Sequence, residues 1–220
     1  MKAVIFDMDG VIVDTNPHHR TAWREYYQRY GKTLSDADFV EYVSGKHNND
    51  ILRHLFAGKT LTADESRQLA HEKEALFREL YSKDITPVVG LIPFLQSLKK
   101  AGILTAVATS APVENLDFVM DALSLRPYFD VLLNESLVTH PKPDPEIYQK
   151  AMDMLGVDPA ESVIFEDSMT GIQAGKASGA SVVGLATTQS LDELYPFVDD
   201  AILDFSQMTL DRLEKLVKIF

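Results

Sequence analysis

The chain has 220 residues, 45% of them hydrophobic and 25% charged, as expected for a globular chain with one sizeable core and a subsidiary domain. It has no cysteine, which excludes disulfides, thiolate metal sites and thiol nucleophiles. Its 21 basic and 33 acidic residues give a net charge of −12, which argues against a nucleic-acid partner because neutralising a phosphate backbone takes clustered lysine and arginine. With no signal-peptide pattern and no membrane-length apolar run, we expect a cytoplasmic monomer without a membrane partner.

Short apolar runs rich in β-branched residues alternate with helical patterns along most of the chain. We expect strands at residues 2–6, 103–108, 131–133, 163–165 and 181–185. After Pro112, apolar residues recur at helical spacing from Val113 to Leu123, as a crossover between parallel strands requires. The alternation predicts an α/β fold, with a doubly wound, Rossmann-like parallel sheet.

A segment with only helical signals interrupts this alternation early in the chain. Asn16, as an N-cap followed by Pro17, predicts one helix start, and a second start lies near Asn48. Capping-box spacing at residues 35–38 and 62–65 predicts two more. We therefore expect an inserted four-helix domain at residues 15–83 and a core domain formed by residues 1–14 and 84–220. Near the C-terminus, we interpret Tyr195 to Phe197 as core packing and residues 210–220 as a terminal helix.

The first expected strand delivers two carboxylates and a glycine to its carboxyl end. Because side chains alternate with a period of two along an extended chain, Asp7 and Asp9 project to the same side. Two like charges there need a cation or a shared proton, and Mg²⁺, which prefers oxygen ligands, would serve. The alternative is a polar strand end that turns into a loop.

Four short motifs occur in a fixed order along the chain. They are Asp7-Met8-Asp9-Gly10-Val11, Thr109-Ser110, the segment from Lys142 to Tyr148, and the segment from Glu166 to Ile172. In this order they resemble the motifs of the haloacid dehalogenase superfamily of phosphotransferases, subfamily I, and more closely its branch of β-phosphoglucomutase-like enzymes and sugar-phosphate phosphatases. The similarity covers nearly the whole chain, including the helical insert.

The resemblance assigns phosphoryl-transfer roles to the first motif. It implies that Asp7 is the nucleophile that forms an aspartyl-phosphate, and that Asp9 is the general acid and then the general base. For Asp9 the alternative is an orienting role beside a metal. Gly10 would let the backbone turn closely past the bound phosphate. The dehalogenases proper lack the second aspartate, so Asp9 favours phosphoryl chemistry over dehalogenation.

The implied cofactor is Mg²⁺. The family's ligands are the nucleophile, the backbone carbonyl of the acid/base aspartate and a carboxylate of the last motif, which here are Asp7, Asp9 and Asp167. Glu166 is a further candidate ligand or a support for one, with a helix N-cap as its alternative.

The resemblance assigns stabilisation of the transferred group to Thr109 and Lys142. We expect the Thr109 hydroxyl and the following backbone N–H groups to face the same crevice as Asp7, and Ser110 to add a donor. Their alternative is a helix cap. Lys142 stands between two prolines, which we expect to hold its segment extended; its alternative is an ordinary surface lysine.

By resemblance, the helical insert is a mobile cap that supplies substrate contacts and excludes water. His19 matches a cap histidine of the mutases, and Lys73 falls where they have a cap lysine. Asn48 stands where they carry an arginine that holds a distal phosphate; asparagine cannot supply that cationic fork. Lys46, His47 and Lys73 are candidates to compensate. The alternatives are packing for His19 and a solvated surface position for the other three.

These departures favour a Mg²⁺-dependent phosphatase of small phosphorylated metabolites, sugar phosphates above all, acting through an aspartyl-phosphate. A β-phosphoglucomutase-like phosphomutase is the alternative, supported by His19, Asp9 and the Lys142 motif. A phosphonatase would need a Schiff-base lysine from the cap, and none is marked out. A catalytically silent module that binds a phosphorylated ligand is a distant alternative from another class.

Overall fold

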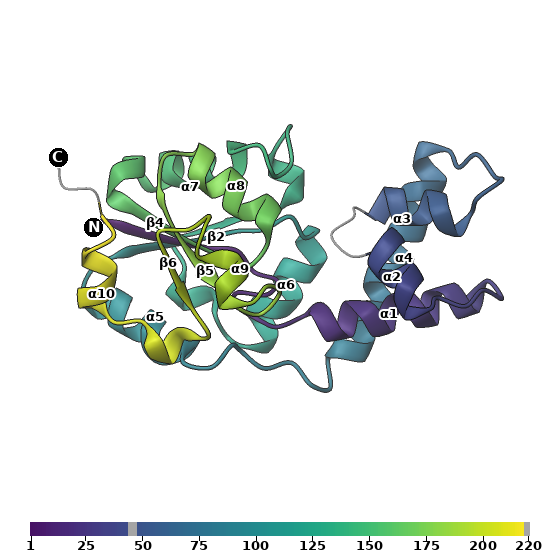
Figure 1. Ribbon diagram of the computed structural model, residues 1–220, viewed down its shortest axis with the longest axis horizontal. Helices are drawn as coiled ribbons and strands as arrows, with labels where there is room; N and C mark the ends of the chain where they lie inside the picture. The colour runs from purple at the N-terminus through teal and green to yellow at the C-terminus, as the bar shows by residue number, and fades with distance from the viewer. Residues whose placement is uncertain (44–47, 218–220) are drawn as a thin grey trace. The chain divides into compact units, whose positions relative to one another are not determined.

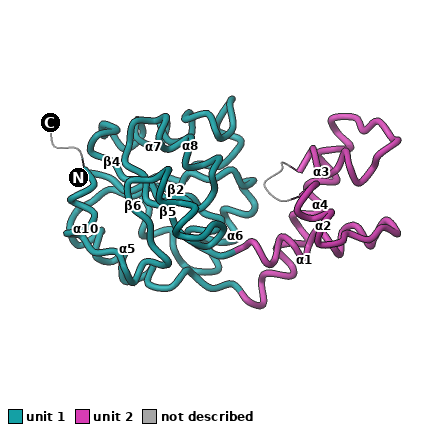
Figure 2. Tube along the Cα trace, viewed as in Figure 1, with its two compact units in different colours: residues 1–14, 85–220 teal, residues 15–84 magenta. Residues whose placement is uncertain are grey.

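The chain folds into two compact units, each with its own core (Figure 2). The computed structural model describes residues 1–43 and 48–217. Unit 1 consists of Met1–Asp14 and Ile85–Phe220, and unit 2 of Thr15–Asp84. The helical insert is thus a separate compact body, and each unit is described here by itself.

Unit 1 is built on a parallel sheet, which among the described residues has six strands in the order β3-β2-β1-β4-β5-β6 (Figure 1). This confirms the predicted doubly wound α/β class. The strand that sequence reasoning missed is β6, a three-residue edge strand with too few apolar residues to show a pattern. The strands are β1 (Ala3–Phe6), β2 (Leu104–Ala108), β3 (Val131–Leu133), β4 (Ser162–Glu166), β5 (Ser181–Leu185) and β6 (Asp200–Ile202).

Both faces of the central strands are buried, which explains why the sequences of these strands are continuous apolar runs. Ile5 and Ile164 belong to a cluster on one face that includes buried residues of α7 (Glu146–Leu155) and α8 (Met169–Ala177). On the opposite face, the rings of Phe6 and Phe165 stack with centroids 5.3 Å apart. Phe94, from α5 (Leu91–Lys100), packs edge-on to both rings. The two clusters fix the central strands from both sides.

The helices of unit 1 alternate with the strands along the chain, because consecutive parallel strands need a connection that returns to the same end of the sheet. The helix after Pro112 forms as predicted, with Pro112 as its N-cap. The α-helices are α5 (Leu91–Lys100), α6 (Val113–Ala122), α7 (Glu146–Leu155), α8 (Met169–Ala177), α9 (Leu191–Leu194) and α10 (Leu210–Glu214), and the 3₁₀ turns are η1 (Arg126–Tyr128), η2 (Glu135–Leu137), η3 (Pro159–Glu161) and η4 (Phe205–Gln207).

Two predictions for the C-terminal region were wrong. Tyr195 and Phe197 are not core residues, because each is 52% exposed. They follow the four-residue helix α9, whose buried residue is Leu194. The terminal helix α10 ends at Glu214, and residues 218–220 lie outside the described residues.

The described part of unit 2 contains four helices around its own apolar core. Both predicted capping boxes are present, at Ser35 with Asp38 and at Thr62 with Glu65. The first helix has its N-cap at Thr15, one residue before the predicted Asn16. The helices are α1 (Asn16–Arg29), α2 (Asp36–Tyr42), α3 (Asn48–Leu55) and α4 (Ala63–Tyr81).

Across the described residues, no helix combines the length and apolar character needed to cross a bilayer.

Candidate active site

The candidate site lies where the strand order of unit 1 reverses. The first strand in the chain, β1, lies between β2 and β4, and the carboxyl ends of parallel strands open a crevice at such a switch point. Asp7 follows β1, Thr109 follows β2, and Glu166 ends β4. The topology therefore brings three of the four sequence motifs to one edge of the sheet.

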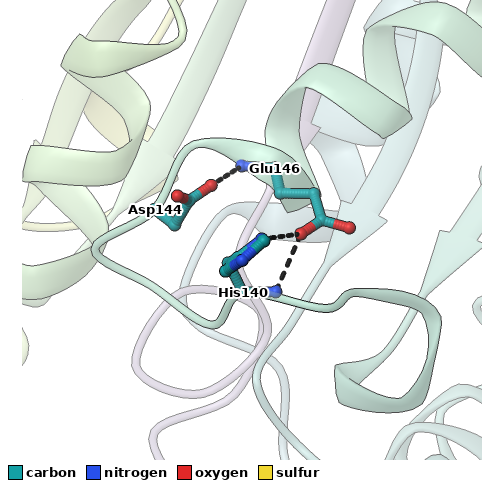
Figure 3. A group of neighbouring side chains, drawn as sticks. All are labelled: His140, Asp144 and Glu146. Carbon is teal, nitrogen blue, oxygen red and sulfur yellow. Dashed lines mark hydrogen bonds and ion pairs between the residues drawn. The ribbon is translucent and has the colours of Figure 1, made fainter.

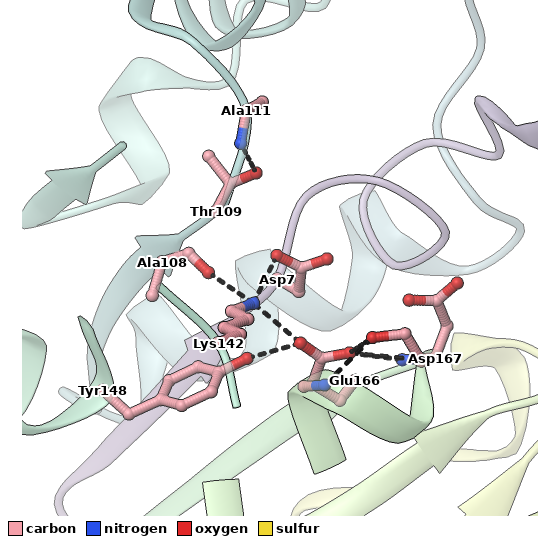
Figure 4. Close-up of polar contacts among 10 residues, drawn as sticks. Asp7, Ala108, Thr109, Ala111, Lys142, Tyr148, Glu166 and Asp167 are labelled. Atoms are coloured by element: carbon pink, nitrogen blue, oxygen red, sulfur yellow. Dashed lines mark hydrogen bonds and ion pairs between the residues drawn. The ribbon is translucent and has the colours of Figure 1, made fainter. Parts of the chain in front are cut away.

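Lys142 forms the centre of this site (Figure 4). Its Nζ donates to Asp7 Oδ1 at 2.8 Å, to Glu166 Oε1 at 2.7 Å and to the carbonyl oxygen of Ala108 at 3.1 Å. The ammonium also lies 4.8 Å from the ring centroid of Tyr148. Since an ammonium has three donors, all of them are used, and Lys142 is buried rather than an ordinary surface lysine.

The segment that carries Lys142 is a turn, so the prediction of an extended segment was wrong. Asp144 N donates to the carbonyl oxygen of Pro141 at 3.0 Å, which closes the turn. The peptide bond between Lys142 and Pro143 is cis, as in a type VI turn. The two prolines therefore shape a tight bend around the lysine.

Glu166 is fully buried and surrounded by donors. Its Oε1 accepts from the Tyr148 hydroxyl at 2.7 Å as well as from Lys142. Its Oε2 accepts from the backbone N–H groups of Asp167 at 3.0 Å and Ser168 at 3.1 Å. The N-cap of α8 is Ser168, whose hydroxyl accepts from Gly171, so Glu166 is not the cap itself. Its contacts orient Lys142 and the start of the last motif.

Two threonines that sequence reasoning missed complete the site. Both follow β5: the hydroxyl of Thr188 donates to Asp167 Oδ2, and that of Thr187 donates to the carbonyl oxygen of Gly10 at 2.5 Å. Paired hydroxyls directly after a buried strand were the signal available in the sequence. They hold the last motif and the first motif in place.

Both the backbone conformation and the close approach of Asp167 require a glycine at position 10 of the first motif. Gly10 has a φ of 78°, in the left-handed region that favours glycine. A Cβ at this position would also lie 2.0 Å from Asp167 Oδ2. Asp9, before it, is half-buried at the same strand end. The bend thus lets the first motif and Asp167 approach closely.

The carboxylates of the site repel one another, and burial strengthens that repulsion. Burial raises the pKa of Asp7 to about 7, although Lys142 favours its ionised form. Burial, together with repulsion from Glu166 and Asp7, raises the pKa of Asp167 well above its ordinary value. Burial would also raise the pKa of Glu166, but the charge and hydrogen bond of Lys142, together with the hydrogen bonds from Tyr148 and Ser168, lower that pKa. Burial opposes the charge of Lys142, yet Asp7 and Glu166 hold its pKa above the usual value.

The donor set fits a divalent cation. Asp7, Glu166 and Asp167 each offer a carboxylate oxygen, and these three oxygens lie within 4.8 Å of one another. One ammonium cannot balance three buried carboxylates, and hard oxygen donors suit Mg²⁺.

Thr109 and Ser110 differ in exposure. Thr109 is buried, and its hydroxyl accepts from the N–H of Ala111 at 3.0 Å (Figure 4). Ser110 is exposed. The capping-type contact of Thr109 leaves the hydroxyl hydrogen available for donation, since a hydroxyl can accept and donate at once.

A second group of metal-ligand types, His140, Asp144 and Glu146, lies in the loop before α7 (Figure 3). Glu146 Oε2 accepts from His140 Nδ1 at 3.0 Å, and Glu146 Oε1 lies 2.5 Å from Lys150 Nζ. Hydrogen bonds from Lys150, then from the backbone of Thr139 and His140, lower the pKa of Glu146 to about 2. Asp144 Oδ1 accepts from the Glu146 N–H at 3.0 Å. These contacts hold the loop against the first turn of α7, and this structural role explains why the three side chains lie together.

Three of the five candidate residues in the insert are described, and they lie together within unit 2. Lys73 Nζ lies 2.8 Å from His19 Nδ1 and 2.8 Å from Glu74 Oε1. Asn48 Nδ2 donates to the same Glu74 oxygen at 2.8 Å. Lys73 is 1% exposed, which excludes the alternative of a solvated surface position for this residue. Lys46 and His47 lie outside the described residues.

Comparisons with known proteins agree with this fold and site. A family model for haloacid dehalogenase-like hydrolases matches residues 1–179. The chain is 31% identical to the phosphorylated carbohydrates phosphatase of Thermotoga maritima, over 100% of this chain and 98% of that protein. It is 32% identical to the β-phosphoglucomutase of Bacillus subtilis, over 87% of this chain and 86% of the enzyme. The crystal structure of a family IA, variant 3 hydrolase from Entamoeba histolytica superposes with a TM-score of 0.93 at 30% identity, covering all of both chains.

The chain therefore belongs to the haloacid dehalogenase-like hydrolases. The family and its phosphatase-named members confirm the predicted class of enzyme, a phosphoric monoester hydrolase.

Proposed function

We propose that this protein is a Mg²⁺-dependent phosphatase of small phosphorylated metabolites, principally sugar phosphates, that works through an aspartyl-phosphate. The observation that carries the proposal is the contact of Lys142 with Asp7 and Glu166 at the switch point of the sheet. A carboxylate beside a buried ammonium is placed to attack a phosphoryl group while the cation neutralises the charge that arrives with it. The T. maritima phosphatase, similar over the full chain, supports this substrate class.

In the proposed mechanism, a carboxylate oxygen of Asp7 attacks phosphorus while the bond from phosphorus to the ester oxygen breaks. Asp9 gives its proton to the departing alcohol. Water then attacks the phosphorus of the aspartyl-phosphate while the bond from phosphorus to the Asp7 oxygen breaks, and Asp9 takes a proton from that water. Inorganic phosphate leaves, and both aspartates return to their starting states.

Lys142 and Thr109 bind the phosphoryl oxygens in this proposal, and the Lys142 hydrogen that Asp7 accepts here passes to the phosphoryl group. The ammonium is held by Glu166 and Ala108, so it is oriented before substrate arrives. Asp7, the backbone carbonyl of Asp9 and Asp167 would hold Mg²⁺, with Glu166 orienting rather than ligating because its oxygens already accept several hydrogen bonds. When bound, the ion supplies charge neutralisation between the attacking carboxylate and the phosphoryl group.

A phosphomutase is the second candidate, because the B. subtilis β-phosphoglucomutase is as similar as the phosphatases. A mutase must hold a bisphosphate while excluding water. We propose that unit 2 acts as a mobile cap with His19 among its substrate contacts, and that Lys73 acts on the substrate through its contact with His19. Asn48 argues against mutase action, because an amide cannot replace a bidentate cation on a distal phosphate.

One experiment separates these candidates. β-Glucose 1-phosphate is incubated with the protein, Mg²⁺ and trace glucose 1,6-bisphosphate, and glucose 6-phosphate and inorganic phosphate are followed in the same phosphorus NMR spectrum. We expect inorganic phosphate to predominate. Predominant glucose 6-phosphate would instead identify a mutase.

A broader screen follows if β-glucose 1-phosphate is inert. Other sugar and polyol phosphates, together with p-nitrophenyl phosphate, are then tested for phosphate release, with Asp7→Asn as the inactive control. Binding of phosphorylated ligands by wild-type protein without turnover of any of them would favour the silent binding module.

A further inference from the structure

Unit 2 buries an ion pair that its core does not need. In the described part of this unit, the buried polar residues are Thr15, Lys73 and Glu74. Lys73 Nζ and Glu74 Oε1 lie 2.8 Å apart, with side chains 1% and 7% exposed. Desolvating two charges usually costs as much as their attraction returns, and an apolar pair of similar volume would be at least as stable. The pair therefore calls for an explanation other than stability.

The surroundings of Lys73 form a cation-binding pocket with one acidic wall. The ammonium lies 4.9 Å from the ring centroid of Trp23 and 5.7 Å from that of Phe77. His19, whose Nδ1 lies 2.8 Å from the ammonium, stacks on Phe77 with ring centroids 3.8 Å apart. Aromatic faces attract a cation but do not cancel its charge. Glu74 is the carboxylate that neutralises Lys73 here.

Glu74 also collects a second donor from another helix. Asn48, the first residue of α3, donates its Nδ2 hydrogen to the same Oε1 atom at 2.8 Å. One carboxylate oxygen thus receives an ammonium of α4 and an amide of α3. An ammonium together with an amide N–H is a donor set that suits a phosphate oxygen equally well. In this protein the Glu74 carboxylate oxygen accepts from both donors, in the position where a phosphate oxygen could otherwise accept from them.

Asn48 and His19 are only half-buried, so the group reaches the protein surface through an amide and an imidazole. The charged pair behind them is neutral as a whole. Among the described residues of this group, a substrate that meets the surface finds an amide and an imidazole suited to hydroxyls, and the cation behind them, Lys73, is already paired with Glu74. A second phosphate would therefore gain no net attraction from this neutral pair.

We propose that Glu74 is a specificity-determining residue that makes the enzyme select monophosphates with an uncharged, hydroxyl-bearing end over bisphosphates. This inference rests on the proposed function and deepens it. Glu74 acts as an internal anion: it accepts from Lys73 and Asn48 and cancels the positive charge that would otherwise attract a second phosphate on the substrate. Removing its charge exposes the positive charge of Lys73 and shifts selection toward bisphosphates.

The test measures inhibition of p-nitrophenyl phosphate hydrolysis by glucose 6-phosphate and by glucose 1,6-bisphosphate, in Mg²⁺ at fixed ionic strength. The selectivity ratio is the inhibition constant of the monophosphate divided by that of the bisphosphate. We expect Glu74→Gln to raise this ratio about tenfold, the size of effect that one added charge-assisted contact gives. The double variant K73Q/E74Q removes both charges and is expected to return the ratio to near the wild-type value.

Glu72→Gln is the matched control, because it removes one negative charge from the same helix. Glu72 accepts from the Tyr26 hydroxyl at 3.2 Å and from Gln68, outside the Lys73 group. Its ratio should stay within twofold of wild type. A general effect of net charge on anion binding would raise the ratio in this variant too, and that result would overturn the proposal.

Asn48→Lys is a second route, in case Glu74→Gln does not fold with an unpaired buried lysine. It adds a cation beside Glu74 at a half-buried position without removing a buried group, and it should also raise the ratio. Thermal unfolding establishes which variants are folded. An active wild-type enzyme whose ratio rises in neither variant would overturn the role of Glu74 alone. A wild-type protein that hydrolyses no phosphomonoester would overturn the proposed function itself.

Discussion

Replacing Asp7 with asparagine should stabilise the metal-free protein at neutral and higher pH while abolishing turnover. The Asp7 side chain is 10% exposed and shares its surroundings with two other buried carboxylates. Asparagine keeps the shape of the side chain and removes its charge. Lys142 stays paired after the substitution, because Glu166 Oε1 lies 2.7 Å from its Nζ. The substitution therefore removes repulsion without leaving the ammonium alone.

The size of the effect follows from the pKa of Asp7, which burial raises from 3.8 to about 7 in the folded protein. Below pH 3.8 the carboxyl is protonated in both states and contributes no difference. As pH rises toward 7, the unfolded state releases its proton first, so the folded state binds more protons and its stability falls. Above pH 7 the whole pKa difference between the folded and unfolded states lowers the free energy of unfolding of the wild type, by about 4 kcal/mol at most.

The assay is urea unfolding in EDTA at several pH values between 4 and 8, followed by circular dichroism. Asp7→Asn should match wild type near pH 4 and exceed it increasingly up to about pH 7, and added Mg²⁺ should stabilise wild type much more than the variant. Asp14→Asn, at an exposed acid shortly after β1, controls for loss of one negative charge. A variant less stable than wild type at pH 8 in EDTA would refute the account of carboxylate repulsion at this site.

Three further substitutions test other parts of the site. Gly10→Ala should abolish Mg²⁺-activated turnover, because the new Cβ would lie 2.0 Å from the Asp167 carboxylate. The control is Gly102→Ala, at a glycine with a similar positive φ but no neighbour within 4 Å, which should lower stability and leave kcat intact. Equal kcat values in the two variants would contradict this prediction. Tyr148→Phe removes a buried hydroxyl donor and should lower the free energy of unfolding by about 1–3 kcal/mol, so an unchanged urea midpoint would show that the hydrogen bond is not needed. Thr188→Val removes the hydroxyl that orients Asp167 and should raise the Mg²⁺ concentration for half-activation about tenfold, which a metal titration of activity measures; an unchanged midpoint would exclude an orienting role.

Local sequence patterns predicted most of the secondary structure. Strands β3 and β5 have the predicted bounds, because their apolar runs end sharply. The capping boxes at Ser35 and Thr62 formed because a hydroxyl and a carboxylate three residues apart satisfy two backbone donors within one turn. Such signals depend on neighbouring residues in the sequence, so they predict local structure correctly whatever the tertiary fold.

Predictions failed where distant residues decide the outcome. The apolar character of Tyr195 and Phe197 suggested burial, but exposure depends on which elements pack above a residue, and each of these two residues is 52% exposed. For Lys73 a solvated surface position was the alternative, yet Trp23, Phe77 and Glu74 surround its ammonium. The exposure of these residues cannot be inferred from their immediate neighbours in the sequence.

By itself the sequence determined the order of the motifs, the strand that carries Asp7 and the residue types required for phosphoryl transfer. The tertiary structure alone decided that Lys142, 135 residues from Asp7, donates to it, that Thr188 holds Asp167, and that Glu74 accepts from two helices at once. The physical reason is that strand ends and helix faces bring together side chains that no local pattern relates. The charge and hydrogen-bond partners of each buried group are then set by that convergence.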